Sequence, residues 1–299
     1  MPVISVVIGT FNLKDKLLKV LDSFNNQNFD MQKTEVIVVD SSSTDGTENA
    51  VKKNKYRFKL NYLSVENKGK AAARNIGIKT AASDIIIITD ADMIAHTDYV
   101  KTHYDLQNKN KREVIIQGKT WILSEEKLPP EKYLRRPYIN KHLRDEQKLD
   151  FYYFLTGNLS LPKILFEKHG YFDENYTGYG WEDIDLGYRL IRKAKQKIIY
   201  AENAVNYHFH VWSDMDELQR REKMGQSVVI LVNKYPELKW FLGINPLNRF
   251  LFLFLSKLQF LIDKWIEETR VGGTGRYKKT LLREFFYYRG YFRAISIIH

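Results

Sequence analysis

The 299-residue sequence contains no cysteine. It therefore offers neither disulfides nor thiolate metal sites, and this usage fits a reducing compartment. No basic segment followed by an apolar segment and a cleavage site precedes the apolar run at residues 3–8, so we expect no signal peptide. The longest apolar run, residues 250–262, is interrupted by Lys257 and Gln259 and falls short of the roughly 20 residues that span a bilayer.

Two phosphate-binding signatures are also missing. No Gly-x-Gly-x-x-Gly follows a predicted strand and no Gly-x-x-x-x-Gly-Lys-Ser/Thr occurs, which argues against a dinucleotide fold and a P-loop nucleotidase. Acidic residues are the minority: 36 Asp and Glu against 47 Lys and Arg give a net charge of +11, which favours anionic partners. Without an RNA-binding module, zinc-finger spacing or recognition helix, we expect no nucleic acid partner.

The chemistry begins at residues 85–92, which read IIIITDAD. The four isoleucines predict a buried strand of a parallel sheet. Asp90 and Asp92 follow at its carboxyl end, where open α/β sheets bind ligands, and residues two apart in an extended segment point the same way. Two carboxylates on one side of a strand end are suitable ligands for a hard divalent cation, Mg²⁺ or Mn²⁺, that bridges to phosphates.

The surrounding segments alternate between strand and helix patterns. Apolar runs predict strands at residues 3–8, 35–40 and 60–65, each followed by a helical segment, so we expect a parallel sheet with right-handed crossovers. Later segments are predicted as a helix (97–109), a strand (113–118), a charged surface excursion (124–150), a helix (183–195), strands (197–201 and 206–212) and a helix (214–233).

Several segments together resemble family 2 glycosyltransferases of the GT-A fold. They are SVVIGTFN (5–12), VIVVD (36–40) with STDGT (43–47), KG (68–69) with ARNIG (73–77), and DAD (90–92), in the order and spacing of that family. A later segment, GYGWEDIDL (178–186), is similar to the acceptor-side motif of β1,4-galactosyltransferases and chondroitin-polymerase-type enzymes. The resemblance covers residues 2–212.

The resemblance implies an α/β fold of the GT-A type, in which helices flank a Rossmann-like, mostly parallel sheet. We expect a donor half at residues 1–118, an acceptor-binding and catalytic half at 119–212, and a helical extension at 213–299. The implied enzyme is a metal-dependent, inverting hexosyltransferase. Its donor is a nucleotide sugar, with UDP favoured by the resemblance, and its acceptor is a hydroxyl of a glycan or of a lipid-linked acceptor.

A divalent cation, Mn²⁺ or Mg²⁺, is the expected cofactor because the departing diphosphate develops charge that a Lewis acid neutralises. The resemblance makes Asp92 a metal ligand and places Asp90 toward the ribose or the metal. A further ligand is expected from a histidine late in the fold. His208 matches best, with His210 as the alternative.

The resemblance also assigns residues to the nucleotide. Asp40 corresponds to the aspartate that reads the uracil ring, and Arg74 to an arginine that approaches the base or the phosphates. Thr10 and Asn12 lie at the tip of the first strand, where they can meet the nucleotide. Ser41 stands where many relatives carry a second aspartate.

An inverting transfer needs a base for the attacking hydroxyl. Asp183 is the predicted base, and Glu182 the residue that binds acceptor or donor sugar, although the two roles can be exchanged. Acidic residues in a first helical turn also stabilise the helix dipole whatever their function.

The predicted acceptor side is rich in aromatic residues and glycine. Trp181, Tyr179 and Tyr176 are candidates to stack on a sugar face, or else ordinary core residues. Gly157 and Asn158 match a family position beside the acceptor site.

The tail from residue 240 changes in composition. Apolar clusters at 250–255 and 285–288 are interleaved with basic residues, and GGTG at 272–275 divides the tail in two. This pattern favours helices that lie in an anionic membrane surface. The expected location is cytoplasmic, peripheral on the inner face of the membrane; the alternative is a helical extension that packs on the catalytic domain or forms a homo-oligomer.

Three other function classes remain open at this point. The chain could be a nucleotide-sugar-binding protein without catalysis, although Asp92 and Asp183 together argue against that. It could be a membrane- or nucleic-acid-binding protein, through its basic tail. A metal-dependent phosphohydrolase would also use carboxylates and histidine, but it would not need Asp40 and Arg74.

Overall fold

The structure is a computed structural model that describes residues 1–139 and 142–298. These residues form two compact units. The sheet unit comprises Met1–Glu174 and Glu182–Val211, and the helical unit comprises Asn175–Trp181 and Trp212–His299. The predicted tail at 213–299 lacks the short first segment of the helical unit. The predicted division of the sheet unit at residue 118 stays a prediction.

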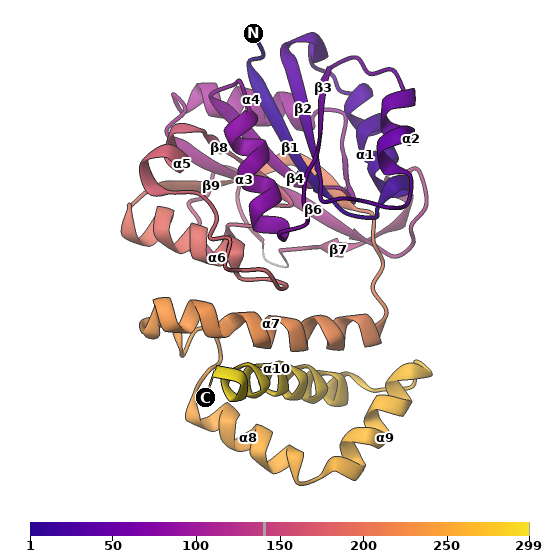
Figure 1. The fold of residues 1–299 in the computed structure, drawn as a ribbon, viewed down its shortest axis with the longest axis vertical. Coiled ribbons are helices and arrows are strands. Elements are labelled where there is room, and N and C mark those ends of the chain that lie inside the picture. The colour runs from indigo at the N-terminus through magenta and orange to yellow at the C-terminus, as the bar shows by residue number, and fades with distance from the viewer. Residues whose placement is uncertain (140–141, 299) are drawn as a thin grey trace. The chain divides into compact units, whose positions relative to one another are not determined.

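The sheet runs in the order β3-β2-β1-β4-β8-β6-β9-β5, with β7 paired to β6 (Figure 1). The strands are β1 (Ile4–Thr10), β2 (Thr34–Asp40), β3 (Lys59–Ser64), β4 (Ile85–Asp90), β5 (Met93–Ala95), β6 (Val114–Leu123), β7 (Leu134–Pro137), β8 (Asn158–Pro162) and β9 (Lys197–His208). Strands β3, β2, β1 and β4 are parallel to one another, and β6 is parallel to β9. The predicted α/β fold with a mostly parallel sheet is confirmed.

One of the antiparallel strands helps to position the site. Strand β8 is antiparallel to both β4 and β6, so its first residue, Asn158, pairs with Thr89 near the end of β4. In the neighbouring strands Gly9 pairs with Asp90, and Thr10 with Asp40. Residues far apart in the sequence therefore reach one edge of the sheet.

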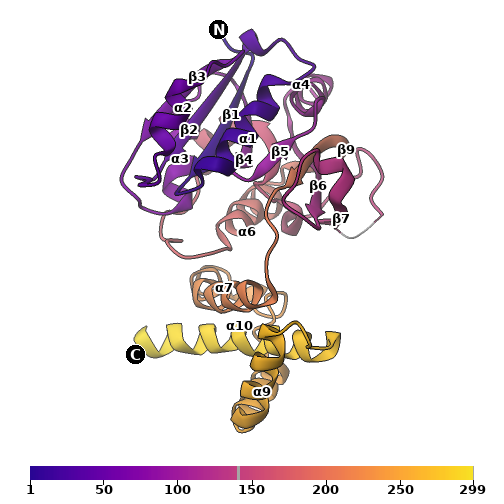
Figure 2. The ribbon, with the colours of Figure 1, turned by 90° about the vertical axis from the view of Figure 1, so that its right-hand side faces the viewer.

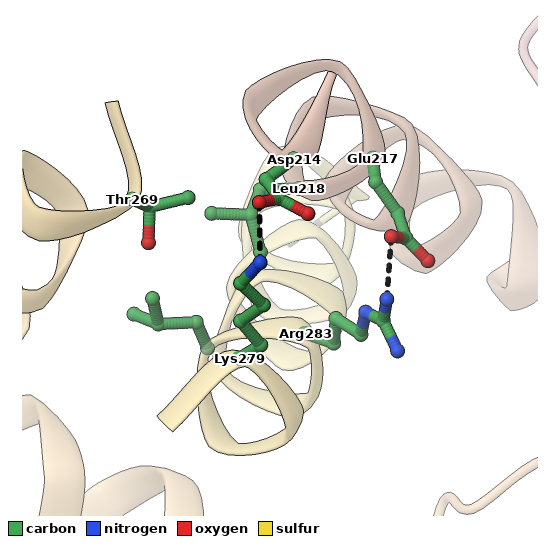
Figure 3. A pocket seen from close by; sticks show the side chains of 7 residues that line it. Asp214, Glu217, Leu218, Thr269, Lys279 and Arg283 are labelled. Carbon is green, nitrogen blue, oxygen red and sulfur yellow. Dashed lines mark hydrogen bonds and ion pairs between the residues drawn. The ribbon is translucent and has the colours of Figure 1, made fainter. Parts of the chain in front are cut away.

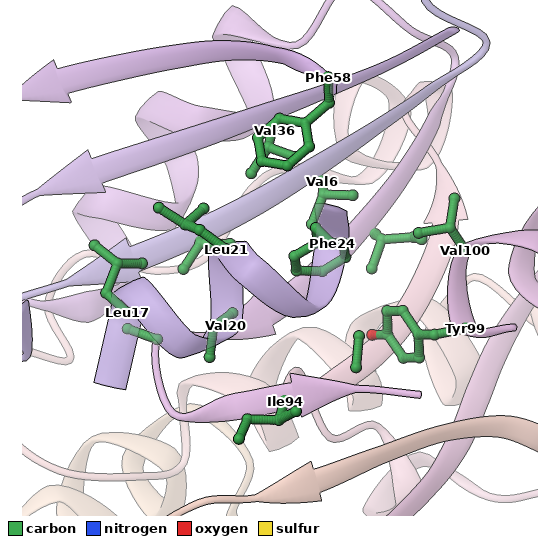
Figure 4. Packing of buried hydrophobic residues seen from close by; sticks show 14 of the residues in the cluster. Val6, Leu17, Val20, Leu21, Phe24, Val36, Phe58, Ile94, Tyr99 and Val100 are labelled. Carbon is green, nitrogen blue, oxygen red and sulfur yellow. The ribbon is translucent and has the colours of Figure 1, made fainter. Parts of the chain in front are cut away.

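The helices of the sheet unit follow the predicted alternation. They are α1 (Lys14–Asn25), α2 (Thr47–Lys53), α3 (Lys70–Thr80), α4 (Tyr99–Lys109), α5 (Ile164–His169) and α6 (Glu182–Gly187), with a π-helical segment at Tyr188–Lys193. Helix α1 shows why the sequence folds in this way: Leu17, Leu21 and Phe24 recur at helical spacing and pack against the sheet residues Val6 and Val36 (Figure 4).

Two sequence predictions were wrong in detail. The strands expected at 197–201 and 206–212 are one strand, β9, because the polar residues between them form a bulge: Gly118 pairs with Ala201, and the next residue, Lys119, with Val205. The charged excursion at 124–150 contains β7 and an antiparallel bridge between Lys148 and Ile199. Residues 140–141 of the excursion lie outside the described residues.

The helical unit contains α7 (Asp214–Lys234), α8 (Pro246–Ser256), α9 (Gln259–Arg270) and α10 (Arg276–Ile298). Helix α7 begins at a capping box between Ser213 and Asp216. Helices α7 and α10 lie side by side, and α10 lies between α7 and the α8–α9 pair (Figures 1 and 2). In the described residues no helix has the length and apolar character that crossing a bilayer requires.

Two glycines allow the close approach of α7 and α10. A Cβ atom on Gly225 would lie 1.9 Å from the carbonyl oxygen of Tyr287, and one on Gly290 would lie 2.0 Å from that of Glu222. Both obstacles are backbone atoms, so a rotamer change cannot relieve either clash. The backbones of the two helices are in contact at this crossing.

We expect Gly225→Ala to destabilise the protein, although alanine favours an isolated helix by about 1 kcal/mol. Overpacking against backbone costs about 1–3 kcal/mol, so the free energy of unfolding should fall. Gly273→Ala is the matched control, since its nearest neighbour would lie 3.7 Å away. Urea unfolding measures both variants. A more stable Gly225→Ala protein would contradict the close crossing.

Candidate active site

A buried arginine connects the end of β4 with the start of α6. Arg74 lies in α3 and is 1% exposed. One of its terminal nitrogens donates to Asp90 Oδ1 at 3.0 Å, and the other donates to Glu182 Oε1 at 3.0 Å and to Asp183 Oδ1 at 2.9 Å. One guanidinium therefore gathers three carboxylates that were predicted to serve different parts of the site.

A second cation, Lys70, balances this acidic cluster. Its ammonium donates to Asp90 Oδ2 at 3.0 Å. Burial opposes the ionisation of Asp90, but Lys70 and Arg74 outweigh it and hold the pKa of Asp90 well below its usual range. Asp90 is therefore a carboxylate whose two oxygens both face cations of the chain.

The two acidic residues of α6 have different surroundings. Asp183 Oδ2 accepts hydrogen bonds from the backbone nitrogen of Thr156 at 3.2 Å and from its hydroxyl at 2.8 Å. Glu182 is 7% exposed, and its Oε2 has no hydrogen-bond partner within the described residues. Burial, followed by the charge of Asp183, raises the pKa of Glu182. Asp183 is held in place by three hydrogen bonds, whereas one oxygen of Glu182 is buried without a partner in the described residues.

The aromatic residues before α6 belong to the helical unit. Trp181 has a φ of 76°, a left-handed conformation that is unfavourable for a bulky side chain. Its indole nitrogen donates to the carbonyl of Met224 at 2.8 Å. Tyr179 stacks on Arg220, with 4.7 Å between the guanidinium carbon and the ring centre, whereas Tyr176 is buried. Helix α7 thus holds this loop, and its predicted sugar contacts stay predictions.

Asp92 lies beside two histidines: His208, the last residue of β9, and His210, which follows the strand. Its Oδ2 is 3.4 Å from His208 Nε2 and 4.0 Å from His210 Nδ1. The ammonium of Lys16 lies 2.6 Å from that same His210 nitrogen and also pairs with Glu126 at 3.1 Å. Because an ammonium can only donate, His210 Nδ1 acts as an acceptor there. His208 is the histidine with the nitrogen nearer to Asp92.

The donor set partly fits a divalent cation. Within residues 1–139 and 142–298, no three His, Asp or Glu side chains converge as a complete metal site. Mg²⁺ and similar ions are commonly held by one or two carboxylates, with substrate phosphates and water completing the shell. Asp92 with His208 supplies such a partial set, whereas the oxygens of Asp90 are bonded to Arg74 and Lys70. The predicted metal roles of all three residues stay predictions.

The predicted nucleotide-binding residues lie at the neighbouring tips of β1 and β2. Asp40 is buried and accepts hydrogen bonds from Tyr62 and from the backbone nitrogen of Ser43. Asn12 has a φ of 50°, and its amide oxygen accepts from the backbone nitrogen of Thr44 at 2.8 Å. The hydroxyl of Thr10 is buried and has no partner among the described residues. The structure brings Thr10, Asn12 and Asp40 together; what they bind stays a prediction.

Gly157 and Asn158 occupy different environments. A Cβ on Gly157 would lie 3.8 Å from Asp90 Oδ2, so this glycine lies next to the acidic cluster. Asn158 is fully buried, and its amide nitrogen donates to the carbonyls of Lys119 and Ala204 at 3.1 and 2.9 Å. The Asn158 side chain therefore joins β8 to β6 and β9, and its predicted acceptor contact stays a prediction.

Sequence reasoning missed four side chains of this site. Lys70 and Thr156 adjoin segments that carried the resemblance, at 68–69 and at Gly157, and that adjacency was the available signal. Lys16 and Glu126 are 110 residues apart and belong to no motif. Only the fold brings that pair to His210.

Comparisons with known proteins identify a family and several similar sequences. The model of the family described as Glycosyl transferase family 2 matches residues 5–170. Validoxylamine A glucosyltransferase of Streptomyces hygroscopicus subsp. jinggangensis is 27% identical over 301 residues, covering 90% of this chain and 69% of the relative. Chondroitin synthase of Pasteurella multocida is 26% identical over 266 residues, covering 78% of this chain but 27% of the relative.

Solved structures confirm the fold. A mannosyltransferase from Pyrobaculum calidifontis in complex with GDP-Man and Mn²⁺ has a TM-score of 0.65 and 17% identity, over 100% of this chain and 88% of the other. Residues 1–349 of TarS from S. aureus in complex with UDP-GlcNAc give a TM-score of 0.61 and 17% identity, over 100% and 93%. These likenesses concern the path of the backbone.

Proposed function

Because the chain belongs to glycosyl transferase family 2 and is a nucleotide-sugar-dependent glycosyltransferase, we propose that it transfers a hexose with inversion from a UDP sugar. The acceptor hydroxyl belongs to a glycan or to a lipid-linked acceptor, and transfer depends on Mn²⁺ or Mg²⁺. One observation carries the proposal: the guanidinium of Arg74 donates hydrogen bonds both to Asp90, on the predicted donor side, and to Glu182 and Asp183, the predicted catalytic acids.

The donor nucleotide binds at the tips of β1 and β2. Asp40 accepts a hydrogen bond from the nucleotide base, and the buried hydroxyl of Thr10, which has no partner among the described residues, bonds to the ribose or a phosphate. The complex of TarS with UDP-GlcNAc supports UDP as the nucleotide. The complex of the archaeal mannosyltransferase with GDP-Man makes GDP the alternative to test.

Asp92 and His208 hold the divalent cation, and the mannosyltransferase complex with Mn²⁺ supports such a cofactor. Bound there, the cation neutralises the charge that develops on the departing diphosphate. Lys16 keeps His210 engaged, so His210 is the weaker candidate ligand.

Asp183 accepts the proton of the acceptor hydroxyl. As the acceptor oxygen bonds to the anomeric carbon, the bond from that carbon to the diphosphate breaks. The diphosphate leaves with the electron pair of that bond. Thr156 and Arg74 hold the Asp183 carboxylate in one orientation. Glu182 contacts a sugar through its unpaired oxygen.

We also propose attachment to the anionic inner face of a membrane, where a lipid-linked acceptor resides. The basic and aromatic composition of residues 240–299 supports this location. The chain spans about a quarter of the length of the chondroitin synthase that it matches, so the acceptor of that synthase is not carried over.

We expect UDP and Mn²⁺ together to raise the unfolding temperature more than either alone, because the diphosphate completes the cation site. A ligand at 100 times its Kd stabilises the folded state by about 2.7 kcal/mol. Asp92→Ala and His208→Ala should abolish the joint shift. His210→Ala, the matched control, should retain most of it.

A joint shift with GDP in place of UDP would change the proposed nucleotide but not the reaction. An unfolding temperature that does not change with UDP, GDP or dTDP would contradict the proposed donor site. The protein could also show the joint shift in unfolding temperature but release no UDP when any UDP sugar is mixed with an acceptor. That result would indicate a nucleotide-sugar-binding protein without catalysis.

A further inference from the structure

Helix α8 carries apolar residues on two opposite sides, and only one of these sides is covered. Its inner side packs on α10: the ring of Phe252 lies 5.3 Å from that of Phe285 and 5.1 Å from that of Phe292. Leu255 is buried in the same cluster. A helix side that carries bulky apolar residues normally packs against another apolar surface.

The opposite side of α8 is exposed. We call Leu247, Phe250, Leu253 and Phe254 the outer face of α8. Leu247 is 73% exposed and Phe250 69%, and Phe260 at the start of α9 is 79% exposed. Bulky apolar side chains gathered in this way mark an interaction surface.

Helix α8 and the residues just before and after it, at 238–262, carry charge of one sign. Residues 238–262 contain no Asp or Glu but include Lys239, Arg249 and Lys257. Lys257 continues the spacing of Leu247, Phe250 and Phe254 at positions three and four apart, so it lies on the same side of the helix. None of these three cations forms an ion pair in the described part of the chain, although the guanidinium of Arg249 lies over the ring of Phe292, 5.8 Å from its centre.

The cations of α10 are used differently. Lys279 pairs with Asp214 and Arg283 with Glu217, both across to α7 at 2.5 Å (Figure 3). The aromatic residues Phe285 and Phe286 of α10 are buried. Helix α10 therefore uses Lys279, Arg283, Phe285 and Phe286 within the fold, although its sequence also interleaves basic and aromatic residues.

We propose that the outer face of α8 inserts into an anionic lipid surface while Lys257, on the same side of the helix, contacts lipid phosphates. This inference rests on the membrane attachment proposed above and assigns it to one surface. A second copy of the chain fits less well. In a twofold contact the outer faces of two copies would meet, so the cations of one copy would face the same cations of the other. Residues 238–262 contain no carboxylate that could pair with them.

Flotation of the full chain with vesicles tests the assignment. We expect binding to phosphatidylcholine vesicles that contain phosphatidylglycerol, and weaker binding to phosphatidylcholine alone. The double variant Phe250→Glu/Phe254→Glu should lower the partition coefficient at least tenfold. Lys257→Gln should lower it about fivefold on anionic vesicles only, and added salt should shrink that difference.

Ile164→Glu is the matched control, because it places a glutamate at an exposed apolar residue in the first turn of α5, where a negative charge favours the helix. It should bind vesicles like the wild type. Nucleotide-dependent thermal stabilisation, measured on every variant, reports folding and the donor site separately.

Each other outcome overturns the assignment. Wild-type binding that the double variant retains would leave membrane attachment intact but move it to another surface. No wild-type binding would reject the attachment itself. A wild-type dimer that the double variant dissociates, without lipid binding, would make the outer face a contact between copies.

Discussion

Asp183→Asn should lower sugar transfer by about 10²–10⁴-fold, the contribution expected of a positioned general base. An asparagine keeps the shape and can still accept from Thr156, but it cannot take the proton of the acceptor hydroxyl. The nucleotide-dependent thermal shift should persist, because Asp183 lies in α6 and not at the tips of β1 and β2. Single-turnover assays with a UDP sugar measure the loss.

Glu182→Gln is the matched control for that experiment. Burial raises the pKa of Glu182 above its ordinary value, and one of its oxygens has no partner in the described residues, so it is the other candidate base. If the roles are exchanged, Glu182→Gln will show the larger loss and the activity of Asp183→Asn will remain. Full activity in both variants would eliminate this acid pair as the source of the base.

Arg74→Met should destabilise the protein by about 3–5 kcal/mol, because it removes the cation from three carboxylates and leaves them facing one another in a buried site. Arg112→Met is the control: that arginine pairs with Asp84 at 3.5 Å on the surface, where such a pair contributes about 0–1 kcal/mol. Urea unfolding at neutral pH compares the two variants.

The destabilisation by Arg74→Met should also depend on pH. Lys70 and Arg74 depress the pKa of Asp90 in the folded state, so the stability from its ionisation is present above the unfolded pKa of about 3.9 and is lost as pH falls through the folded pKa. The difference between wild type and variant should therefore shrink in acid. A difference that is constant with pH would mean that the loss comes from packing and not from charge.

Strong local patterns predicted most of the fold. The four isoleucines before Asp90 form β4, and the helix expected at 214–233 is α7 at Asp214–Lys234. Each of these segments has one dominant period of apolar residues, which suffices to define its type whatever it packs against. The two strands expected where β9 runs failed because a bulge, which depends on the partner β6, interrupts the pattern.

The site was predictable as a set of residues but not as an arrangement. Asp90, Arg74, Glu182 and Asp183 were all named from motifs, yet their common contact was not, since Arg74 and Asp183 are 109 residues apart in the chain. An arginine in a helix can serve a nucleotide or a carboxylate equally well, and its sequence neighbours do not distinguish the two.

The tail shows the same division. Its sequence by itself determined that basic and aromatic helices follow residue 240, because composition and helical spacing are local properties. Only the tertiary structure decided that cations of α10 form ion pairs with Asp214, Glu217 and Glu222 of α7, while the outer face of α8 stays exposed. The partners of a charge or of an apolar face lie elsewhere in the chain, and folding alone brings them together.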